Sequence, residues 1–228
     1  MTENPYITPA ADPSPVHHHS SNAPVIPSLE QVQYPLLFTF KIVAFAPQLS
    51  VTDATGREIL YVKQKLFKFK EAVEVFSDKS KSNLLGTIKA NKVIDWSARY
   101  FFHTASQESI GSVGRKGMKS LWKASYEVFS HGAESPEYKI TEENPMAKVF
   151  DSLLGEIPII GFGTAYLFNP KYGAVNHANN MTSMRLSKQP AFFEGKFKLE
   201  KLQEMPKDEE VSLIFSFLML VLLERARG

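Results

Sequence analysis

The stretch Val211-Ser-Leu-Ile-Phe-Ser-Phe-Leu-Met-Leu-Val-Leu-Leu223 decides the fold of this chain, because only Ser212 and Ser216 among its 13 residues are polar. Three acids precede it and two arginines follow it, which is the order of charges that a helix dipole favours. A helix of this length spans about 20 Å, short of the roughly 30 Å of hydrocarbon in a bilayer. A helix that is apolar on every side has to be surrounded. The sequence therefore predicts a buried helix at about residues 209–226.

Every second residue is apolar in several stretches upstream of this helix. The clearest such stretches are residues 96–102, 122–128 and 193–199. An apolar face opposite a polar face is typical of antiparallel strands that have one side in water. Residues that favour turns separate the strands, as in Asp53-Ala-Thr-Gly56, Ser77-Asp-Lys-Ser80 and Asn169-Pro-Lys-Tyr-Gly173. The pattern predicts many short antiparallel strands.

One-sided strands can surround an apolar helix only if their sheet closes. Closure also removes the edge strands through which sheets aggregate. Small barrels are filled by their own side chains, so enclosing a helix requires on the order of eleven or twelve strands. The sequence therefore predicts a mainly β fold, a closed antiparallel barrel of about twelve strands around a central hydrophobic C-terminal α-helix. A membrane tail is the alternative role for the helix.

The first 32 residues have a different composition from the rest of the chain. Six of the 14 prolines lie there, and no Lys or Arg occurs before Lys41, so we expect no secretory signal. Such a segment buries too little apolar surface to offset the entropy lost on ordering. We therefore expect a disordered tail at residues 1–32, of which residues 1–30 can be deleted without loss of folding, and a barrel domain at residues 33–228.

Composition and motif spacing exclude several classes of function. The 228 residues include no Cys, which excludes disulfides, thiolate metal sites and cysteine nucleophiles. A net charge of +2 is too balanced to indicate nucleic acid as a partner. Ile110-Gly-Ser-Val-Gly114 lacks the spacing of a nucleophile elbow, and the acids at 208–210 do not alternate as calcium ligands do. We predict a protein that is not an enzyme and has no metal site and no cofactor.

Basic residues supply the one concrete candidate site in the sequence. Four lysines between residues 60 and 70 would share the outer face of a strand if a β-bulge interrupts the alternation at Leu66-Phe67. Lysines near a membrane attract anionic headgroups by about 1 kcal/mol each, although solvated strand lysines that protect an edge give the same pattern. The predicted lipid-binding residues, in two basic stretches, are Lys63, Lys65, Lys68, Lys70, Arg115, Lys116 and Lys119.

The run from Val51 to Glu71, VTDATGREILYVKQKLFKFKE, resembles the opening hairpin of the superfamily that contains phospholipid scramblases, LURP-one-related proteins and tubby C-terminal domains. It has a DxxG turn, an apolar strand and a KQK basic stretch. Glu74–Asp78 and Leu85–Ala90 continue in the same style, and the apolar C-terminal helix is similar in kind and place to the central helix of that superfamily. The resemblance covers residues 36–226 and implies a twelve-stranded barrel around this helix.

The resemblance implies binding rather than catalysis. Tubby domains bind phosphoinositides through surface basic residues, and scramblases are linked to calcium and lipid movement. We expect a cytoplasmic barrel, in peripheral contact with the inner membrane surface, that binds anionic phospholipid headgroups or a protein partner. One alternative is a membrane-attached, scramblase-like protein whose C-terminal helix inserts in lipid. Another is a hydrolase whose site lies in the mouth of the barrel.

Overall fold

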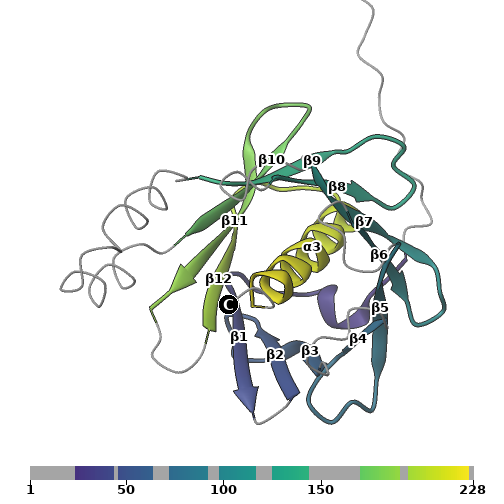
Figure 1. Ribbon diagram of the computed structural model, residues 1–228, viewed down its shortest axis with the longest axis vertical. Helices are drawn as coiled ribbons and strands as arrows, with labels where there is room; N and C mark the ends of the chain where they lie inside the picture. Colours follow the sequence, from purple (N-terminus) through teal and green to yellow (C-terminus); the bar gives the residue numbers. More distant parts are fainter. Residues whose placement is uncertain are drawn as a thin grey trace, which may run out of the picture.

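Twelve antiparallel strands form a closed ring around one long helix in the computed structural model (Figure 1). The structure describes residues 24–43, 46–63, 72–91, 98–116, 125–143, 170–190 and 195–225. The elements in chain order are η1 (Pro27–Leu29, a 3-10 helix), β1 (Leu36–Val43), β2 (Ala46–Thr52), β3 (Glu58–Lys63), β4 (Val73–Phe76), β5 (Leu84–Ala90), β6 (Arg99–Thr104), β7 (Ser109–Lys116), β8 (Ser125–Ser130), β9 (Tyr138–Glu142), β10 (Lys171–Asn176), β11 (Thr182–Gln189), β12 (Gly195–Lys201) and α3 (Lys207–Arg225).

Each strand pairs with the next one along the chain, and the barrel is closed by pairing of β1 with β12. The alternation of buried and exposed side chains follows the predicted period of two. In β6, for example, Tyr100 and Phe102 are buried whereas Arg99 and Phe101 are partly exposed. The predicted fold class is therefore confirmed, including the number of strands and the central position of the helix.

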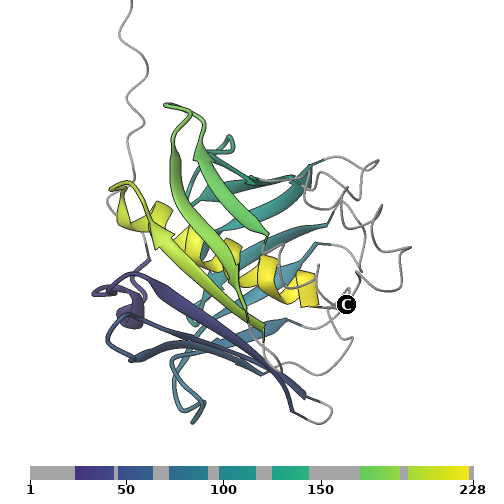
Figure 2. The ribbon, with the colours of Figure 1, turned by 90° about the vertical axis from the view of Figure 1, so that its left-hand side faces the viewer.

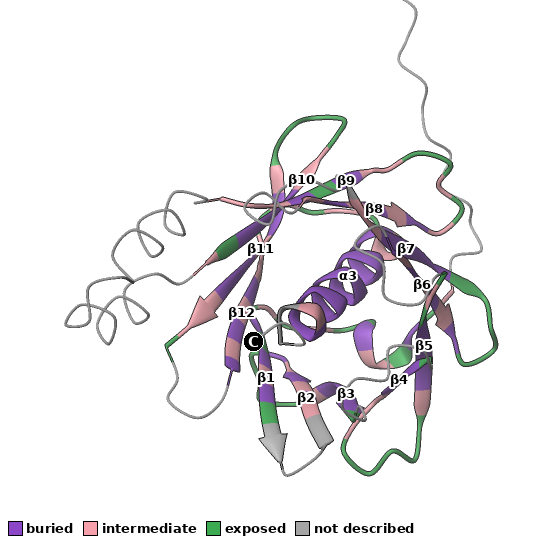
Figure 3. Cartoon of the chain, viewed as in Figure 1, coloured by how far each residue is buried: buried purple, intermediate pink, exposed green. Residues whose placement is uncertain are grey.

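Helix α3 runs through the interior of the barrel (Figure 2). Every residue from Glu209 to Leu222 is buried, and Figure 3 shows the helix as the most continuously buried element. Its two serines find acceptors inside the protein, because Ser212 Oγ donates to the carbonyl of Ile110 at 2.8 Å and Ser216 Oγ donates to the carbonyl of Ser212 at 2.7 Å. No helix among the described residues has both the length and the apolar character that a membrane span requires.

Helix α3 lies closest to the wall formed by β6, β7 and β8. The approach is permitted by Gly111 of β7, since a Cβ atom there would lie 2.7 Å from Ser212 Oγ and 2.4 Å from the carbonyl oxygen of Phe129. On the same wall the rings of Phe102 and Phe215 pack with their centroids 5.6 Å apart. Strands β6–β8 are therefore directly supported from inside by the helix.

Of the three turn signals in the sequence, those at 53–56 and 77–80 are turns and the one at 169–173 is not. Asp53 closes the first, because its Oδ1 accepts the backbone N–H groups of Thr55 at 3.0 Å and Arg57 at 3.2 Å. The third was expected at 169–173, but residues 171–173 belong to β10, and the chain turns at 177–179 instead. Gly173 indicated a turn in the sequence. In the strand it provides space, because a Cβ atom there would lie 2.7 Å from Glu143 Oε1.

The predicted tail also differs at its end, because Ile26 and Leu29 are buried in the core at 1% and 0% exposure. Both belong to the segment around η1, which contacts β3. Two aliphatic side chains among prolines have no periodicity, so the sequence did not distinguish them from the tail. The packed part of the chain therefore already includes residue 26 and does not start only at residue 33. The expected disorder of residues 1–23 lies outside the described residues.

This burial changes the expected result of truncation. Deleting residues 1–30 should lower the free energy of unfolding by about 4 kcal/mol or more, since losing one buried aliphatic side chain typically costs about 2–5 kcal/mol. Deleting residues 1–23 should leave the stability unchanged. Urea unfolding of both truncated proteins and the full chain measures the difference. Equal midpoints for all three would show that Ile26 and Leu29 contribute nothing to the core.

Candidate functional site

The predicted lipid-binding residues do not come together as one site. Lys65, Lys68, Lys70 and Lys119 lie outside the described residues, and so do the predicted β-bulge and the side chain of Lys116. Lys63 ends β3 and is exposed on the outer face, as expected. The two predicted basic stretches belong to β3 and β7, which are four positions apart in the ring.

Arg115 lies on the inner face of β7 rather than on the outer surface. It is two residues from the buried Val113 and directly opposite the buried Tyr126 of β8. Its Nε and Nη1 atoms are buried. The period-two alternation would have predicted this, since residues two apart on a strand share a face. Arg115 and Lys63 therefore cannot contact one headgroup.

The fold instead assembles lysines from both ends of the chain on one outer surface, here called the lysine face. Antiparallel pairing of β1 with β12 brings residue 41 and residue 196 to adjacent strands. Each lysine alternates with a buried apolar neighbour, such as Phe40 in β1 and Phe197 in β12, and so points outward. The lysine face consists of Lys41, Lys63, Lys171, Lys196 and Lys198.

Strand register sets the spacing of the lysine face. Lys41 and Lys63 flank Gln48 of β2 from the two neighbouring strands. Because adjacent strands lie about 4.8 Å apart, two residues that flank one strand are separated by about 10 Å at their backbones. Long lysine side chains can cover that interval and converge on one polyanionic group.

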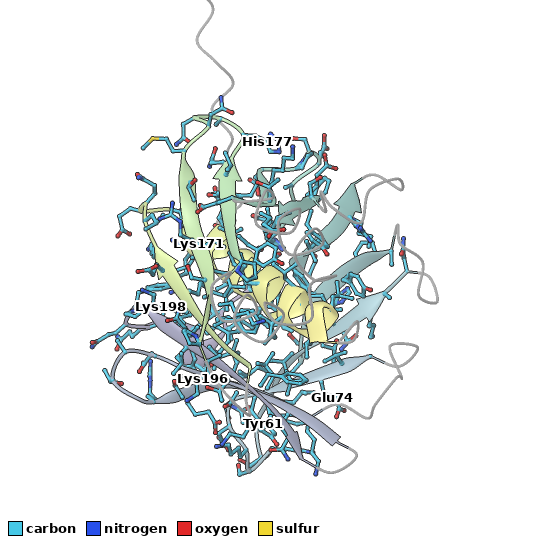
Figure 4. All side chains as sticks on the ribbon, turned by 60° about the vertical axis from the view of Figure 1, so that its left-hand side comes forward. Tyr61, Glu74, Lys171, His177, Lys196 and Lys198 are labelled. Carbon is cyan, nitrogen blue, oxygen red and sulfur yellow. The ribbon has the colours of Figure 1, made fainter. Side chains whose placement is uncertain are left out.

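The upper part of the lysine face repeats this arrangement. Lys171 and Lys198 flank Ser187 of β11, and Lys196 lies two residues from Lys198 on the same side of β12. Figure 4 shows Lys171, Lys198 and Lys196 along one side of the barrel. Lys171 is exposed, and Lys196 and Lys198 are partly exposed.

Two carboxylates of the described residues lie at the margin of the lysine face, one paired with Lys198 of the face itself and the other with Arg185. Glu200 Oε1 is 2.9 Å from Lys198 Nζ, and Glu143 Oε1 is 2.9 Å from Arg185 Nε. Exposed pairs of this kind exchange readily, since each contributes only about 0–1 kcal/mol. The surface therefore keeps a positive potential that suits an anionic ligand.

A second cluster of ionisable groups lies at the start of α3. The phenol of Tyr34 donates to Glu210 Oε1 at 2.7 Å, and the phenol of Tyr138 donates to Glu209 Oε2. Burial, reinforced by the neighbouring carboxylate, raises the pKa of both phenols above the usual value. Lys201 Nζ lies 3.4 Å from Glu210 Oε2. Protonated phenols and a paired carboxylate hold the helix in place, so the geometry supports an anchor and not an acid–base centre.

Metal and catalytic chemistry finds little support in the described ranges. No group of three or more His, Asp or Glu side chains there is placed to hold a metal ion. His103 and His131 are separate from each other, because His103 lies on β6 and His131 follows β8. His131 Nδ1 is hydrogen-bonded to the carbonyl of Ser109 at 2.7 Å.

Three comparisons place the chain among known proteins. A family model described as LURP-one-related matches residues 36–160. This family belongs to the superfamily of tubby-like proteins and scramblases. The X-ray structure of a protein from Arabidopsis thaliana is similar with a TM-score of 0.47 and 10% sequence identity, over 90% of this chain and 99% of that chain. No curated protein matches the chain significantly.

Proposed function

The chain belongs to the LURP-one-related family, and from that premise we propose that its barrel binds the anionic headgroups of phospholipids through the lysine face, without catalysing a reaction. The observation that carries the proposal is the register that aligns Lys41 with Lys63 across β2 and Lys171 with Lys198 across β11. Lysines whose backbones lie about 10 Å apart, with side chains long enough to converge, suit a headgroup that carries more than one phosphate.

The shape of the surface favours a membrane over a free anion. The lysines lie on the outer face of the strands from β10 through β12 and β1 to β3, so an extended surface such as a bilayer can offer headgroups to several of them at once. Lysines near an anionic bilayer contribute about 1 kcal/mol each, and their attraction falls off within a Debye length. The exposed Leu37, directly opposite Lys198, adds an apolar contact at the same surface. We place the protein in the cytoplasm, in peripheral contact with the inner membrane surface.

Replacing Lys41, Lys171, Lys196 and Lys198 together with glutamine should weaken binding to phosphoinositide-containing vesicles by about a hundred-fold. If all four lysines touched the membrane, at about 1 kcal/mol each, the loss of affinity would be larger than this. Not every lysine contacts a headgroup at the same time, so the expected loss is smaller. Vesicle flotation and sedimentation measure the affinity, with pure phosphatidylcholine vesicles as the blank. Melting temperature should change little, because exposed substitutions cost at most about 0.5 kcal/mol each.

A matched control removes the same charge from elsewhere on the barrel. Lys79, Lys81, Lys89 and Lys139 are all exposed and lie outside the lysine face. Replacing these four with glutamine should reduce vesicle binding by less than about three-fold. Equal losses in the two variants would show that net charge and not this surface governs binding. Undiminished vesicle binding in the first variant would exclude the lysine face as the lipid-binding surface.

A further inference from the structure

The wall centred on β7 carries an arginine held between two phenylalanine rings. In the closed ring β7 is six positions from β1 in either direction. Arg99 and Phe101 of β6 and Phe129 of β8 point outward there, and each is partly exposed. With Ser112 of β7, these residues are here called the arginine–aromatic cluster.

The guanidinium of Arg99 is fixed by three contacts. Its Cζ atom lies 3.7 Å from the centroid of the Phe129 ring and 5.7 Å from that of Phe101. Its Nε–H donates to Ser112 Oγ at 3.0 Å. The side chain crosses β7 over Gly114, where a Cβ atom would lie 3.4 Å from Arg99 Cγ. The absence of a side chain at residue 114 thus leaves a path for the arginine from β6 to β8.

This cation has no carboxylate partner within the described part of the chain. Nε is used by Ser112, and the two terminal Nη groups point the planar fork of the guanidinium away from that bond. Of the nearby charged groups, Lys89 is opposite Phe101, and Glu127 lies opposite both Gly114 and Lys139, in the row that contains Arg99. Glu127 has an interaction of its own. Glu137, the other nearby acid, accepts the backbone N–H of Ser130 at 3.1 Å.

The wall behind the cluster is rigid. Strand β7 is bonded to α3 through Ser212, and α3 packs most closely on β7 and β8. A side chain already held in one conformation loses little entropy when it binds. Arginine and aromatic residues are also the types that are enriched at the centres of protein interfaces, where an arginine fork holds a carboxylate by two parallel hydrogen bonds.

We propose that the arginine–aromatic cluster is a docking site for a protein partner, and that Arg99 receives a carboxylate side chain from a short segment in which acidic and apolar residues are mixed. The rings of Phe101 and Phe129 would contact the apolar neighbours of that acid. A headgroup in water offers no such apolar neighbour, and β7 at the centre of the cluster lies opposite β1 of the lysine face. The inference stands on the cluster alone. With the proposed function added, the barrel would bind a membrane through the lysine face and a protein through the arginine–aromatic cluster.

The test uses NMR titration of the full chain with a synthetic peptide of alternating glutamate and leucine, and a second peptide with glutamine in place of glutamate. The glutamate peptide should shift the Nε–H signal of Arg99 and the amide signal of Gly114 in a saturable manner. The glutamine peptide should bind at least about ten-fold more weakly, because it offers no charge-assisted hydrogen bonds.

Two variants separate the docking role from a purely structural one. R99K keeps the charge but loses the planar fork, and F129L keeps an apolar residue but loses the ring. Each substitution should lower the affinity for the glutamate peptide about ten-fold, while the melting curve stays close to that of the unmodified protein. Replacement of Lys139 with glutamine, on the neighbouring strand, should change the affinity by less than about two-fold.

Each contrary result overturns the inference. Glutamate and glutamine peptides that bind equally, or R99K that binds as well as the unmodified chain, would exclude carboxylate recognition by Arg99. No saturable shift at Arg99 and Gly114 would exclude the cluster as a docking site. Anionic vesicles that shift these signals, in place of the peptide, would make it a lipid contact. Vesicle binding by R99K should otherwise be unchanged, so this test and that of the lysine face fail independently.

Discussion

Replacing Phe217 with aspartate should leave no cooperatively folded protein. Phe217 is 0% exposed in the centre of α3, so the substitution removes a ring from the core and buries a carboxylate without a partner. Losing the ring costs about 3–5 kcal/mol and the unpaired charge costs several more, whereas a domain has only about 5–15 kcal/mol of net stability. Near-ultraviolet circular dichroism and calorimetry should show no native signal and no transition.

Met181 provides the matched control, because it is 48% exposed. Its replacement with aspartate introduces the same charge at the surface and should shift the unfolding free energy by less than about 0.5 kcal/mol. Deletion of residues 211–228 should give insoluble or molten protein for the same reason as F217D. A truncated chain that stays monodisperse and melts near the full-length value would show that the barrel does not need its helix.

Replacing Gly111 with alanine is the second change for which we expect a large loss of stability. The backbone there has a φ of +151°, and an added Cβ atom would lie 2.4 Å from the carbonyl oxygen of Phe129. Neither this oxygen nor α3 behind it can move without disturbing the pairing of β7 with β8. We expect a loss of about 2–5 kcal/mol, from the unfavourable φ together with overpacking. Urea unfolding gives this value directly.

Replacing Gly132 with alanine separates the cost of the backbone conformation from the cost of overpacking. Its φ is +72°, but an added Cβ atom would meet nothing within 4 Å. Alanine at residue 132 should therefore cost only the conformational part, about 1–2 kcal/mol. Similar losses at residues 111 and 132 would show that α3 does not press against β7 as closely as the structure indicates.

The parts of the fold that the sequence predicted are those with a local signal. A continuous apolar stretch at 211–223 and a period of two in the strands are readable within a window of a few residues, and together they require a closed barrel. The run at 51–71 identified the superfamily, and the family match over residues 36–160 confirms it. The burial of Ile26 and Leu29 depends on packing against distant strands, so no local pattern announced it.

The candidate site illustrates the same limit. Lysines clustered in sequence between residues 63 and 70 suggested a patch, but the lysine face joins residue 41 to residues 171, 196 and 198. Only closure of β1 on β12 brings these together, and register cannot be read from one strand alone. Arg115 is a different case, because the sequence does show that it shares a strand face with the apolar Val113. The basic residues next to it suggested an outer surface instead, and that prediction was wrong.

Pairing of β1 with β12 also fixes the order of events during synthesis. Strand β1 is made long before its partner β12 and the helix α3. Until then the apolar faces of eleven strands have neither a closed ring nor a helix to cover them. Contacts between residues so far apart in sequence form slowly, and exposed strands aggregate in the meantime. The newly made chain is therefore open to aggregation until α3 has been made, and a premature stop anywhere before residue 211 leaves a barrel without its centre.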